Sequence, residues 1–221
     1  MIHADWKNYI ISDAALKERS RTLQFWPFLE AASALSQELN RPVSLLDCGC
    51  ACGHLAKMLD QHGIRHDYVG LDYDADLLRL GREHYEQKKL AQGDIRALPF
   101  KEKHFDVVVA YDILYLMENQ EAVLKELVRV ARYLLAVETH HAPCGSNSLK
   151  MRMHSRHSYT RLDNLQHAPE LYKASNLPEP DWTVLWEVPS TYFKYLGLPY
   201  RIRNLSLWRL PPPSTQRGAE C

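Results

Sequence analysis

The sequence lacks the long hydrophobic runs that mark membrane-spanning or exported proteins. Its 221 residues contain no stretch of eighteen consecutive apolar residues, the length that a membrane-spanning helix needs. The longest candidate, residues 105–116, is interrupted by Asp106 and Asp112. The first residues show neither a basic region nor an apolar stretch, so we expect no signal peptide. These features predict a cytoplasmic protein without a membrane partner.

An excess of charge of one sign is also missing. The chain carries 27 Lys and Arg against 27 Asp and Glu, which gives a formal net charge of zero. This balance argues against a strongly basic nucleic-acid-binding protein. With 46% hydrophobic and 24% charged residues, the composition is that of a folded globular protein and excludes intrinsic disorder. The length predicts a single domain.

Cysteine is scarce and unsuited to disulfides or zinc. The chain has five cysteines, an odd number, and three of them alternate at Cys48, Cys50 and Cys52. This pattern is not a secreted disulfide framework. Structural zinc sites use a C-x₂₋₄-C pair together with a second pair elsewhere, and the sequence has no second pair. We therefore expect no metal and interpret the three cysteines as small residues that fill a tight loop.

What the sequence does contain is an alternation of strand and helix patterns. Residues 5–40 are predicted to be helical, with a first helix capped by Ser12 or Asp13 and a second running from Pro27 to about Leu39. Apolar strands and amphipathic helices then alternate through residues 43–139. The strands are predicted at residues 43–46, 68–71, 89–92, 105–110 and 134–137, and the helical stripes at residues 55–62, 77–85 and 123–134. Continuous apolar strands separated by amphipathic helices predict a parallel sheet covered on both faces.

The last third of the chain follows a different pattern. Residues 182–188 and 200–210 read as two strands, which we expect to add to the sheet as an antiparallel pair. The fold class is therefore α/β, a doubly wound mixed sheet. A single domain would occupy residues 1–210, with N-terminal helices (1–42), a ligand-binding core (43–139), an insert or lid (140–181) and terminal strands (182–210). A flexible tail would follow at residues 211–221.

Four aspartates follow the predicted strands and suggest a binding site. Asp47, Asp72, Asp94 and Asp112 each lie at or just beyond the carboxyl end of a strand. In an open parallel sheet, ligands bind outside these strand ends. Aspartate is also a good turn and cap residue, which would explain any one of them. Four at successive strand ends favour a ligand site.

The turn after the first strand excludes two common ligand classes. Within residues 47–54, Gly49 and Gly53 permit a close backbone approach. The dinucleotide fingerprint needs glycine or a near substitute at its first, third and sixth positions. Counting from Gly49 places Ala51 third, where it would crowd a diphosphate, and His54 sixth, where a close contact between helix and strand needs a very small residue. The sequence also has no G-x-x-x-x-G-K-[ST] motif. The turn therefore suits a ligand without a diphosphate.

Several stretches in order resemble the class I S-adenosylmethionine-dependent methyltransferase family. They are LLDCGCACG at residues 45–53, VGLD at residues 69–72, and GD followed by LPF at residues 93–100. The segment FDVVV from residue 105 through Asn119 and the helix at residues 121–132 resemble the family's later elements. The resemblance covers about residues 43–139. It implies methyl transfer from S-adenosylmethionine to an oxygen or nitrogen of a small molecule; an RNA or protein methyltransferase and a non-catalytic module with this fold stay open as alternatives.

The resemblance also implies a role for individual residues. The turn would line the methionine part of the cofactor, Asp47 would brace the turn, and Asp72 would accept hydrogen bonds from both ribose hydroxyls. Asp94 would take the adenine amino group while Ile95 packs on the ring, and the carbonyl near Ala110 or Tyr111 would receive the methionine ammonium. The implied cofactor-binding set is Asp47, Gly49, Ala51, Gly53, Asp72, Tyr73, Asp94, Ile95 and Tyr111.

The sequence departs from the family pattern at two places. Ala51 stands where the family usually has glycine. The Pro-Gly-Gly turn that is common before the fifth strand is absent, because Arg132-Tyr133-Leu134 runs straight on. The second departure leaves the start of the fifth strand open.

Methyl transfer asks little of the protein beyond holding the nucleophile in line. A base is needed only when the attacking atom carries a proton. His140 and His141, predicted just past the fifth strand, are the candidate catalytic residues, although surface loops carry histidine freely. Tyr111 and Tyr115 could also serve as the base.

A basic segment could recognise the acceptor. Residues 139–162 contain no acidic side chain. The basic residues in this segment are Lys150, Arg152, Arg156 and Arg161. This segment is either a solvated surface or a lid that contacts an anionic substrate. Tyr115, Arg152 and Arg156 are the candidate substrate-binding residues. One basic segment offers little for tracking the phosphates of a nucleic acid, so we expect a small-molecule partner.

Overall fold

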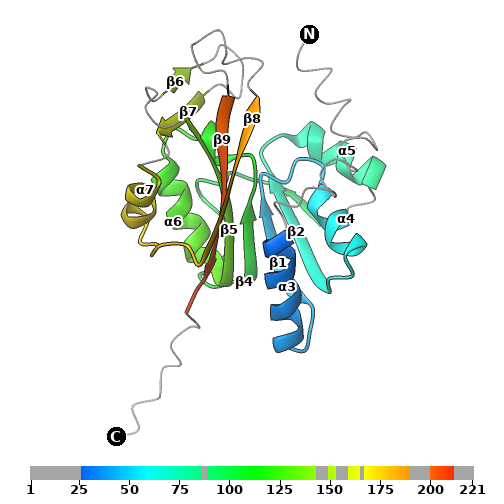
Figure 1. Cartoon of the computed structure of the whole chain (residues 1–221). Coiled ribbons are helices and arrows are strands. Elements are labelled where there is room, and N and C mark those ends of the chain that lie inside the picture. The colour runs from blue at the N-terminus through cyan, green and yellow to red at the C-terminus, as the bar shows by residue number, and fades with distance from the viewer. Residues whose placement is uncertain are drawn as a thin grey trace, which may run out of the picture.

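The computed structural model describes residues 26–85, 89–142, 149–152, 159–164, 167–189 and 200–211. These residues form one sheet with helices on both faces (Figure 1). Three expectations concern residues outside these ranges: the first predicted helix near Ser12, the position of Arg156, and most of the predicted tail. Within the described ranges, no helix combines the length and apolar character that crossing a membrane requires.

Two layers of helices cover the sheet. On one face, α3 (Trp26–Glu38) and α4 (His54–Gln61) pack against the strands together with Leu78 of α5 (Ala75–Tyr85). On the other face, α6 (Gln120–Val130) and α7 (Ala168–Ala174) bury their apolar sides. A short 3₁₀ helix, η2 (Leu114–Leu116), follows the fourth strand. The expected second helix from Pro27 to about Leu39 is thus confirmed as α3.

The strand order is that of a mixed, doubly wound sheet. β3 (Leu90–Gln92), β2 (His66–Asp72), β1 (Val43–Cys48), β4 (Phe105–Ala110) and β5 (Ala131–Ala142) lie side by side and parallel. β9 (Tyr200–Arg209) pairs antiparallel with β5, and β8 (Trp182–Pro189) pairs antiparallel with β9. The predicted fold class is confirmed.

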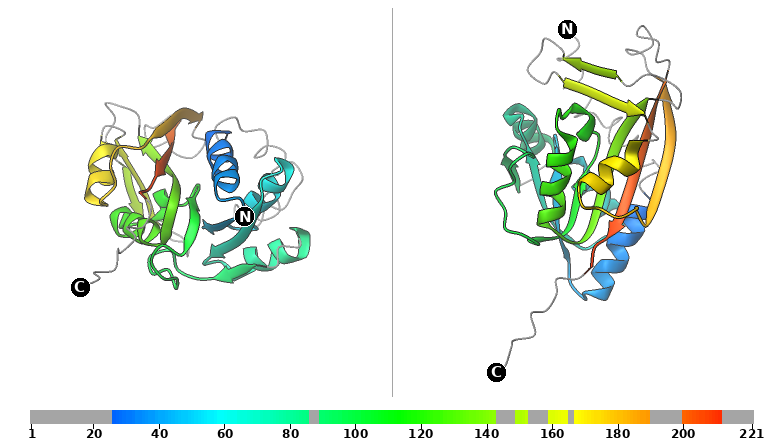
Figure 2. Two further views of the ribbon diagram at one scale, coloured as in Figure 1. Left: turned by 90° about the horizontal axis from the view of Figure 1, so that it is seen from below. Right: turned by 90° about the vertical axis from the view of Figure 1, so that its left-hand side faces the viewer.

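A hairpin extends the sheet beyond the end of β4. β6 (Leu149–Arg152) and β7 (Tyr159–Asn164) pair antiparallel, and β7 runs parallel to the last two residues of β5. β9 occupies one edge of β5 from Leu134 to His141, so β7 takes the other edge, which β4 leaves beyond Val137. Figure 2 shows this hairpin beyond the end of the main sheet. Part of the predicted insert is therefore a continuation of the sheet.

The fifth strand begins earlier and ends later than the sequence predicted. α6 ends at Val130, and Ala131 already has extended backbone with φ −80° and ψ 134°. Leu134, which we expected both to end a helical stripe and to begin the fifth strand, belongs to the strand and pairs with Val107 of β4. The helix passes into the strand without intervening turn residues, which accounts for the missing Pro-Gly-Gly turn. At its other end β5 includes His140 and His141, which the sequence placed just past the strand.

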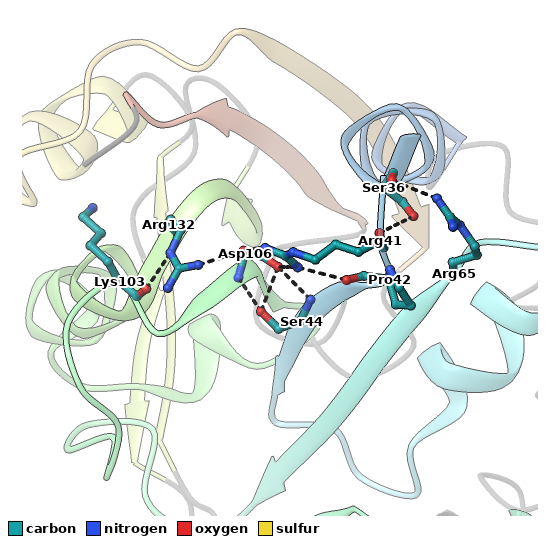
Figure 3. A network of polar contacts seen from close by, with 8 residues as sticks. All are labelled: Ser36, Arg41, Pro42, Ser44, Arg65, Lys103, Asp106 and Arg132. Carbon is teal, nitrogen blue, oxygen red and sulfur yellow. Dashed lines mark hydrogen bonds and ion pairs between the residues drawn. The ribbon is translucent and has the colours of Figure 1, made fainter. Parts of the chain in front are cut away.

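An enclosed aspartate ties the amino-terminal ends of the strands together (Figure 3). The Asp106 side chain has no exposed surface and binds the guanidinium groups of Arg41 and Arg132. It also accepts hydrogen bonds from the backbone N–H and the hydroxyl of Ser44. Burial on its own would raise the pKa of Asp106, but hydrogen bonds from Arg41 and Ser44 outweigh it and hold that pKa below the ordinary value. The network joins β1, β4 and β5 to the segment after α3.

Asp106→Asn should destabilise the fold. The variant leaves two guanidinium groups without their carboxylate, and we expect the free energy of unfolding at pH 7 to fall by about 2 kcal/mol. Because the native pKa of Asp106 lies below its unfolded value, this stabilisation is present at neutral pH and is lost as the pH drops through the native pKa. Urea unfolding at pH 7 and near pH 3 measures both effects, and the difference between wild type and variant should shrink at the lower pH. Glu83→Gln, which breaks an exposed ion pair with Arg79, is the control and should change little. Equal loss in the two variants would contradict the role of Asp106.

Candidate functional site

The four predicted aspartates lie along one edge of the sheet. Asp47 and Asp72 are at the ends of β1 and β2, while Asp94 and Asp112 each lie two residues beyond β3 and β4. These strands are parallel and adjacent, so their carboxyl ends meet at the same edge. This is the edge at which open α/β sheets bind ligands.

The turn between β1 and α4 depends on left-handed backbone. Gly49 and Gly53 have φ of 76° and 79°, and Ala51 between them has φ of 51°. The Gly49 N–H donates to the Leu71 carbonyl at 2.8 Å, which holds the turn against the end of β2. A Cβ on Gly49 would lie 2.8 Å from Cγ1 of Ile113. The turn is therefore packed tightly between β2 and the segment after β4.

The Asp72 carboxylate joins this turn to β2. Its Oδ2 accepts a hydrogen bond from the Ala51 N–H at 2.8 Å, and its Oδ1 accepts one from the Asp74 N–H at 2.9 Å. Two backbone donors thus fix the orientation of a partly exposed carboxylate. Ala51 and Asp72, predicted separately to bind one ligand, are in direct contact.

Asp47, directly before the turn, is anchored in the protein interior. The carboxylate is buried, and its Oδ2 accepts a hydrogen bond from the Tyr68 hydroxyl at 2.7 Å. Burial raises the pKa of Tyr68 well above its ordinary value, and the negative charge of Asp47 raises it further. Tyr68 is a site residue that sequence reasoning missed, because it reads only as part of an apolar strand.

The three alternating cysteines fill the space around the turn. Cys48, Cys50 and Cys52 are all buried and free. Burial raises the pKa values of the Cys48 and Cys50 thiols well above the ordinary value. Thiols that stay protonated are poor metal ligands and poor nucleophiles.

Beyond β3, Asp94 is already held by a basic side chain. Arg96 binds both carboxylate oxygens through its guanidinium group, with Nη2 2.6 Å from Oδ2 and Nε 2.9 Å from Oδ1. The hydrogen bond from Arg96 lowers the pKa of Asp94. Ile95 is buried in the core next to Leu71 and Leu98. Tyr73 is largely exposed, so of these predicted residues it presents the most surface to solvent.

Tyr111 connects the end of β4 to the N-terminal helix. Its ring packs edge-on against Phe28 of α3, with ring centroids 5.7 Å apart. Burial of its hydroxyl raises the pKa of Tyr111 well above the ordinary value. The backbone of Tyr111 lies directly after β4, at the edge where the four aspartates gather.

A second polar cluster lies between the ends of β4 and β5. His140 Nε2 is 2.9 Å from Glu138 Oε1 and 3.2 Å from Asp112 Oδ1. The ring of Tyr115 stacks on that of His140, with centroids 4.2 Å apart and an angle of 12° between the planes. Arg203 of β9 binds both carboxylate oxygens of Glu138. Sequence reasoning named Asp112, Tyr115 and His140 but missed Glu138 and Arg203.

The buried Glu138 is held in its ionised form. Burial on its own would raise its pKa, yet hydrogen bonds from His140 and Arg203 lower the pKa of Glu138 to about 2. In turn, contact with Glu138 overcomes the effect of burial and raises the pKa of Arg203. The cluster therefore holds an ion pair between Glu138 and Arg203, close to Asp112.

The structure separates the two candidate catalytic histidines. Successive side chains of a strand point to opposite faces, so His140 shares a face with Glu138, and His141 shares the other face with Thr139. His141 Nε2 is 2.7 Å from Thr139 Oγ1. This face also holds a buried hydrogen-bond network of Tyr172, Asn204 and Ser206. His141 thus lies near α7, away from the cluster that contains Asp112.

The predicted substrate-binding arginines belong to the hairpin beyond β5. Arg152 is the last residue of β6 and pairs with Tyr159 of β7. Arg156 lies in the connection between the two strands, outside the described residues. The hairpin stands at the same end of β5 as His140, which is consistent with a position next to the site.

Gly49→Ala should destabilise the protein more than a matched glycine replacement elsewhere. Both Gly49 and Gly63 have left-handed backbone, but a Cβ on Gly63 meets nothing within 4 Å. Gly63→Ala should therefore cost only the backbone strain, about 1 kcal/mol. Gly49→Ala adds a clash with Ile113, and we expect a loss of about 2–3 kcal/mol. Urea unfolding of the two variants measures the difference; equal losses would show that the turn has room for a side chain.

Comparison with known proteins finds a family and several relatives that match part of the chain. Residues 46–133 match the sequence model of a family described as "Methyltransferase domain". Malonyl-[acyl-carrier protein] O-methyltransferase of Pectobacterium atrosepticum is 28% identical over 90 residues, which cover 41% of this chain and 35% of that protein. Ubiquinone biosynthesis O-methyltransferase of Acinetobacter baylyi is 34% identical over 79 residues, covering 36% and 32%. The matches span about a third of the length of these relatives.

A solved structure shares the fold over most of the chain. The 1,6-didemethyltoxoflavin-N1-methyltransferase of Burkholderia thailandensis, solved with 1,6-didemethyltoxoflavin and S-adenosylhomocysteine, superposes with a TM-score of 0.52. The match covers 81% of this chain and 78% of that one at 17% sequence identity. At this identity the likeness concerns the fold alone.

Proposed function

We propose that this chain is a class I S-adenosylmethionine-dependent methyltransferase that transfers a methyl group to a small molecule, because residues 46–133 match the sequence model of a methyltransferase domain. The observation that carries the proposal is the hydrogen bond from the Ala51 N–H to Asp72. It joins the turn after β1 to a carboxylate at the end of β2, and both would face the same ligand.

The residues at this edge suit a nucleoside joined to an amino acid. A carboxylate such as Asp72 accepts hydrogen bonds from two neighbouring hydroxyls, as a ribose offers, and charge-assisted bonds are the stronger kind. The left-handed residues Gly49, Ala51 and Gly53 bring their backbone to the surface of the turn, where the methionine part would lie. A diphosphate fits poorly, because Ala51 and His54 stand at positions where the dinucleotide fingerprint needs glycine or a near substitute.

The remaining cofactor contacts extend this assignment along the edge. The backbone at Tyr111 would receive the methionine ammonium, and Tyr73 and Ile95 would flank the nucleoside. Asp94 would accept the adenine amino group after exchanging one of its bonds to Arg96. When bound, the cofactor supplies a methyl group on a sulfonium, which is an activated leaving group; the protein's task is to orient the acceptor and to exclude water.

An oxygen atom of a small molecule is the favoured acceptor. The two relatives described above are named as O-methyltransferases, and this is the support for oxygen over nitrogen. Tyr115 and Arg152 would contact the acceptor, since η2 and the hairpin lie at the carboxyl end of β5. Arg156 in the same hairpin connection would assist with an anionic part of it. Of the two histidines, we propose a role for His140 alone, because His141 belongs to the opposite face.

Asp72→Asn should weaken cofactor binding. Calorimetry with S-adenosylhomocysteine should show binding to wild type, and loss of the charge-assisted bonds should raise the dissociation constant about tenfold or more. Asp67→Asn is the matched control, because Asp67 lies in the same strand but at its opposite, exposed end, where it pairs with Lys89. Unchanged affinity in Asp72→Asn would mean that the ribose does not bind at the end of β2. No binding to wild type would contradict the proposed function itself.

Substitutions in the Asp94–Arg96 pair should act in opposite directions. If Arg96 competes with the adenine amino group for Asp94, Arg96→Gln should leave S-adenosylhomocysteine binding unchanged or strengthen it. Asp94→Asn should weaken binding about threefold to tenfold, since a neutral amide is a poorer acceptor. The same calorimetric titration measures both. Equal weakening by the two substitutions would show that the ion pair itself supports the site.

A further inference from the structure

The order of the strands places the nucleoside and the amino acid part of the proposed ligand at the ends of different strands. Adjacent strands lie about 4.8 Å apart, and the order here is β3, β2, β1, β4, β5. A nucleoside held at β2 and β3 leaves its amino acid part over β1 and β4. The sulfonium joins these two parts, so the reacting centre lies near the ends of β1 and β4, close to Asp112, which is two residues beyond β4. This inference rests on the proposed function.

The polar cluster between the ends of β4 and β5 contains charged side chains that differ in exposure. The side chains of Glu138 and His140 are 0% exposed, that of Arg203 is 20% exposed, and that of Asp112 is 37% exposed. Among the described members of the cluster, Asp112 is therefore the charged group that a ligand meets first. Both carboxylate oxygens of Glu138 are bound by Arg203, so the more buried carboxylate is already neutralised.

The Asp112 side chain is directed to the cluster from a left-handed backbone. Its φ is 54°, a region that aspartate adopts more readily than most other residues with a side chain. Its Oδ1 lies 3.2 Å from His140 Nε2 and 3.9 Å from a guanidinium nitrogen of Arg203. His140 is itself held between Glu138 and the stacked ring of Tyr115. The buried network thus fixes the groups that face the Asp112 carboxylate.

We propose that Asp112 is the residue that contacts the methyl acceptor, and that His140, Glu138 and Arg203 are positioning residues that hold its carboxylate at the reacting centre. A carboxylate there accepts a hydrogen bond from the attacking group. The acceptor class that it fits is a neutral hydroxyl or amine, which carries a proton on the attacking atom. A carboxylate acceptor would place a second anion beside Asp112.

The transfer balances with Asp112 as the proton acceptor. A lone pair on the acceptor's oxygen or nitrogen forms the bond to the methyl carbon, while the carbon–sulfur bond breaks and its electron pair stays on sulfur. The proton that the acceptor loses moves to a carboxylate oxygen of Asp112 and from there to solvent. The methylated acceptor and the thioether leave the site without any oxidant or reductant.

Arg203 gives this cluster a positive charge of its own. One oxygen or nitrogen atom from each of Asp112, Glu138 and His140 lies within 4.8 Å of the others, a spacing at which the three could bind a metal ion. The guanidinium of Arg203, however, already binds Glu138 and lies near Asp112. We therefore assign the cluster to proton transfer with an internal counter-charge.

The charge of the cofactor provides a test that needs no known acceptor. S-adenosylmethionine carries a positive sulfonium, whereas S-adenosylhomocysteine has a neutral thioether in its place. An anionic Asp112 at the reacting centre should favour the charged ligand. By calorimetry, Asp112→Asn should weaken S-adenosylmethionine binding about fivefold and change S-adenosylhomocysteine binding less than twofold. Glu121→Gln, an equal change of charge at an exposed pair in α6, should alter neither.

The outcomes separate this inference from the proposed function. If wild type binds neither ligand, the proposed function is wrong. If wild type binds both, and Asp112→Asn weakens both equally or neither, the function stands and the role of Asp112 is wrong. Unfolding curves of each variant accompany the titrations and establish that the variant is folded when its two affinities are compared.

The positioning residues are tested by the same preference. The quantity to compare is the affinity for S-adenosylmethionine divided by the affinity for S-adenosylhomocysteine. His140→Ala should reduce this ratio, because Asp112 loses the imidazole that orients it. Arg203→Lys keeps the charge but not the two-pronged contact with Glu138, and it should retain part of the ratio. An unchanged ratio in His140→Ala would assign the network to stability alone.

The acceptor class is tested with a matched pair of aromatic probes. With a labelled methyl donor, wild type should methylate catechol faster than benzoate, and Asp112→Asn should lose that activity about thirtyfold or more while still binding S-adenosylhomocysteine. Faster transfer to benzoate, or no difference between the two probes, would overturn the assignment of a proton-bearing acceptor.

Discussion

The hydrogen bond between the Ala51 N–H and the Asp72 carboxylate is the constraint from which the site is built. It requires left-handed backbone at Ala51, a residue that pays about 1 kcal/mol or more for that conformation. A hydrogen bond to an ionised group contributes about 1.5–3 kcal/mol, enough to offset the strain. The bond therefore explains how a residue other than glycine occupies the middle of this turn. It also fixes β1, β2 and their loops as one rigid edge.

The two ends of the sheet use aspartate for opposite purposes. At the amino-terminal end, Asp106 is wholly enclosed and bound by two arginines, so its charge serves the stability of the fold. At the carboxyl end, Asp72 and Asp112 are partly exposed, and their carboxylates are held by backbone donors or by a buried network. The chemistry of the side chain is the same in each case. What differs is whether the surrounding groups leave a carboxylate surface that a ligand can reach.

The sequence predicts the local features of the site and misses the ones that depend on distant pairing. Asp47, Gly49 and Asp72 stand out because strand ends and turns leave a pattern within a few residues. The Arg203 contact with Glu138 joins residues far apart in the chain and has no such signal. The different surroundings of His140 and His141 were within reach, since alternate residues of a strand face opposite sides. Ending the predicted fifth strand at Val137 hid that alternation, because it placed both histidines in a loop.

The antiparallel strand β9 therefore matters to the site as well as to the sheet. Its register pairs Arg203 directly with His140 and places the guanidinium next to Glu138. A shift of one residue would turn Arg203 to the face of α6 and α7 and leave Glu138 buried without its counter-charge. Removing one partner from a buried ion pair typically costs about 3–5 kcal/mol, so that register is strongly favoured. The ion pair between Arg203 and Glu138 thus has two effects: it selects the register of β9, and it keeps Glu138 ionised next to His140. In this way the antiparallel strand that makes the sheet mixed also supplies a charge to the proposed site.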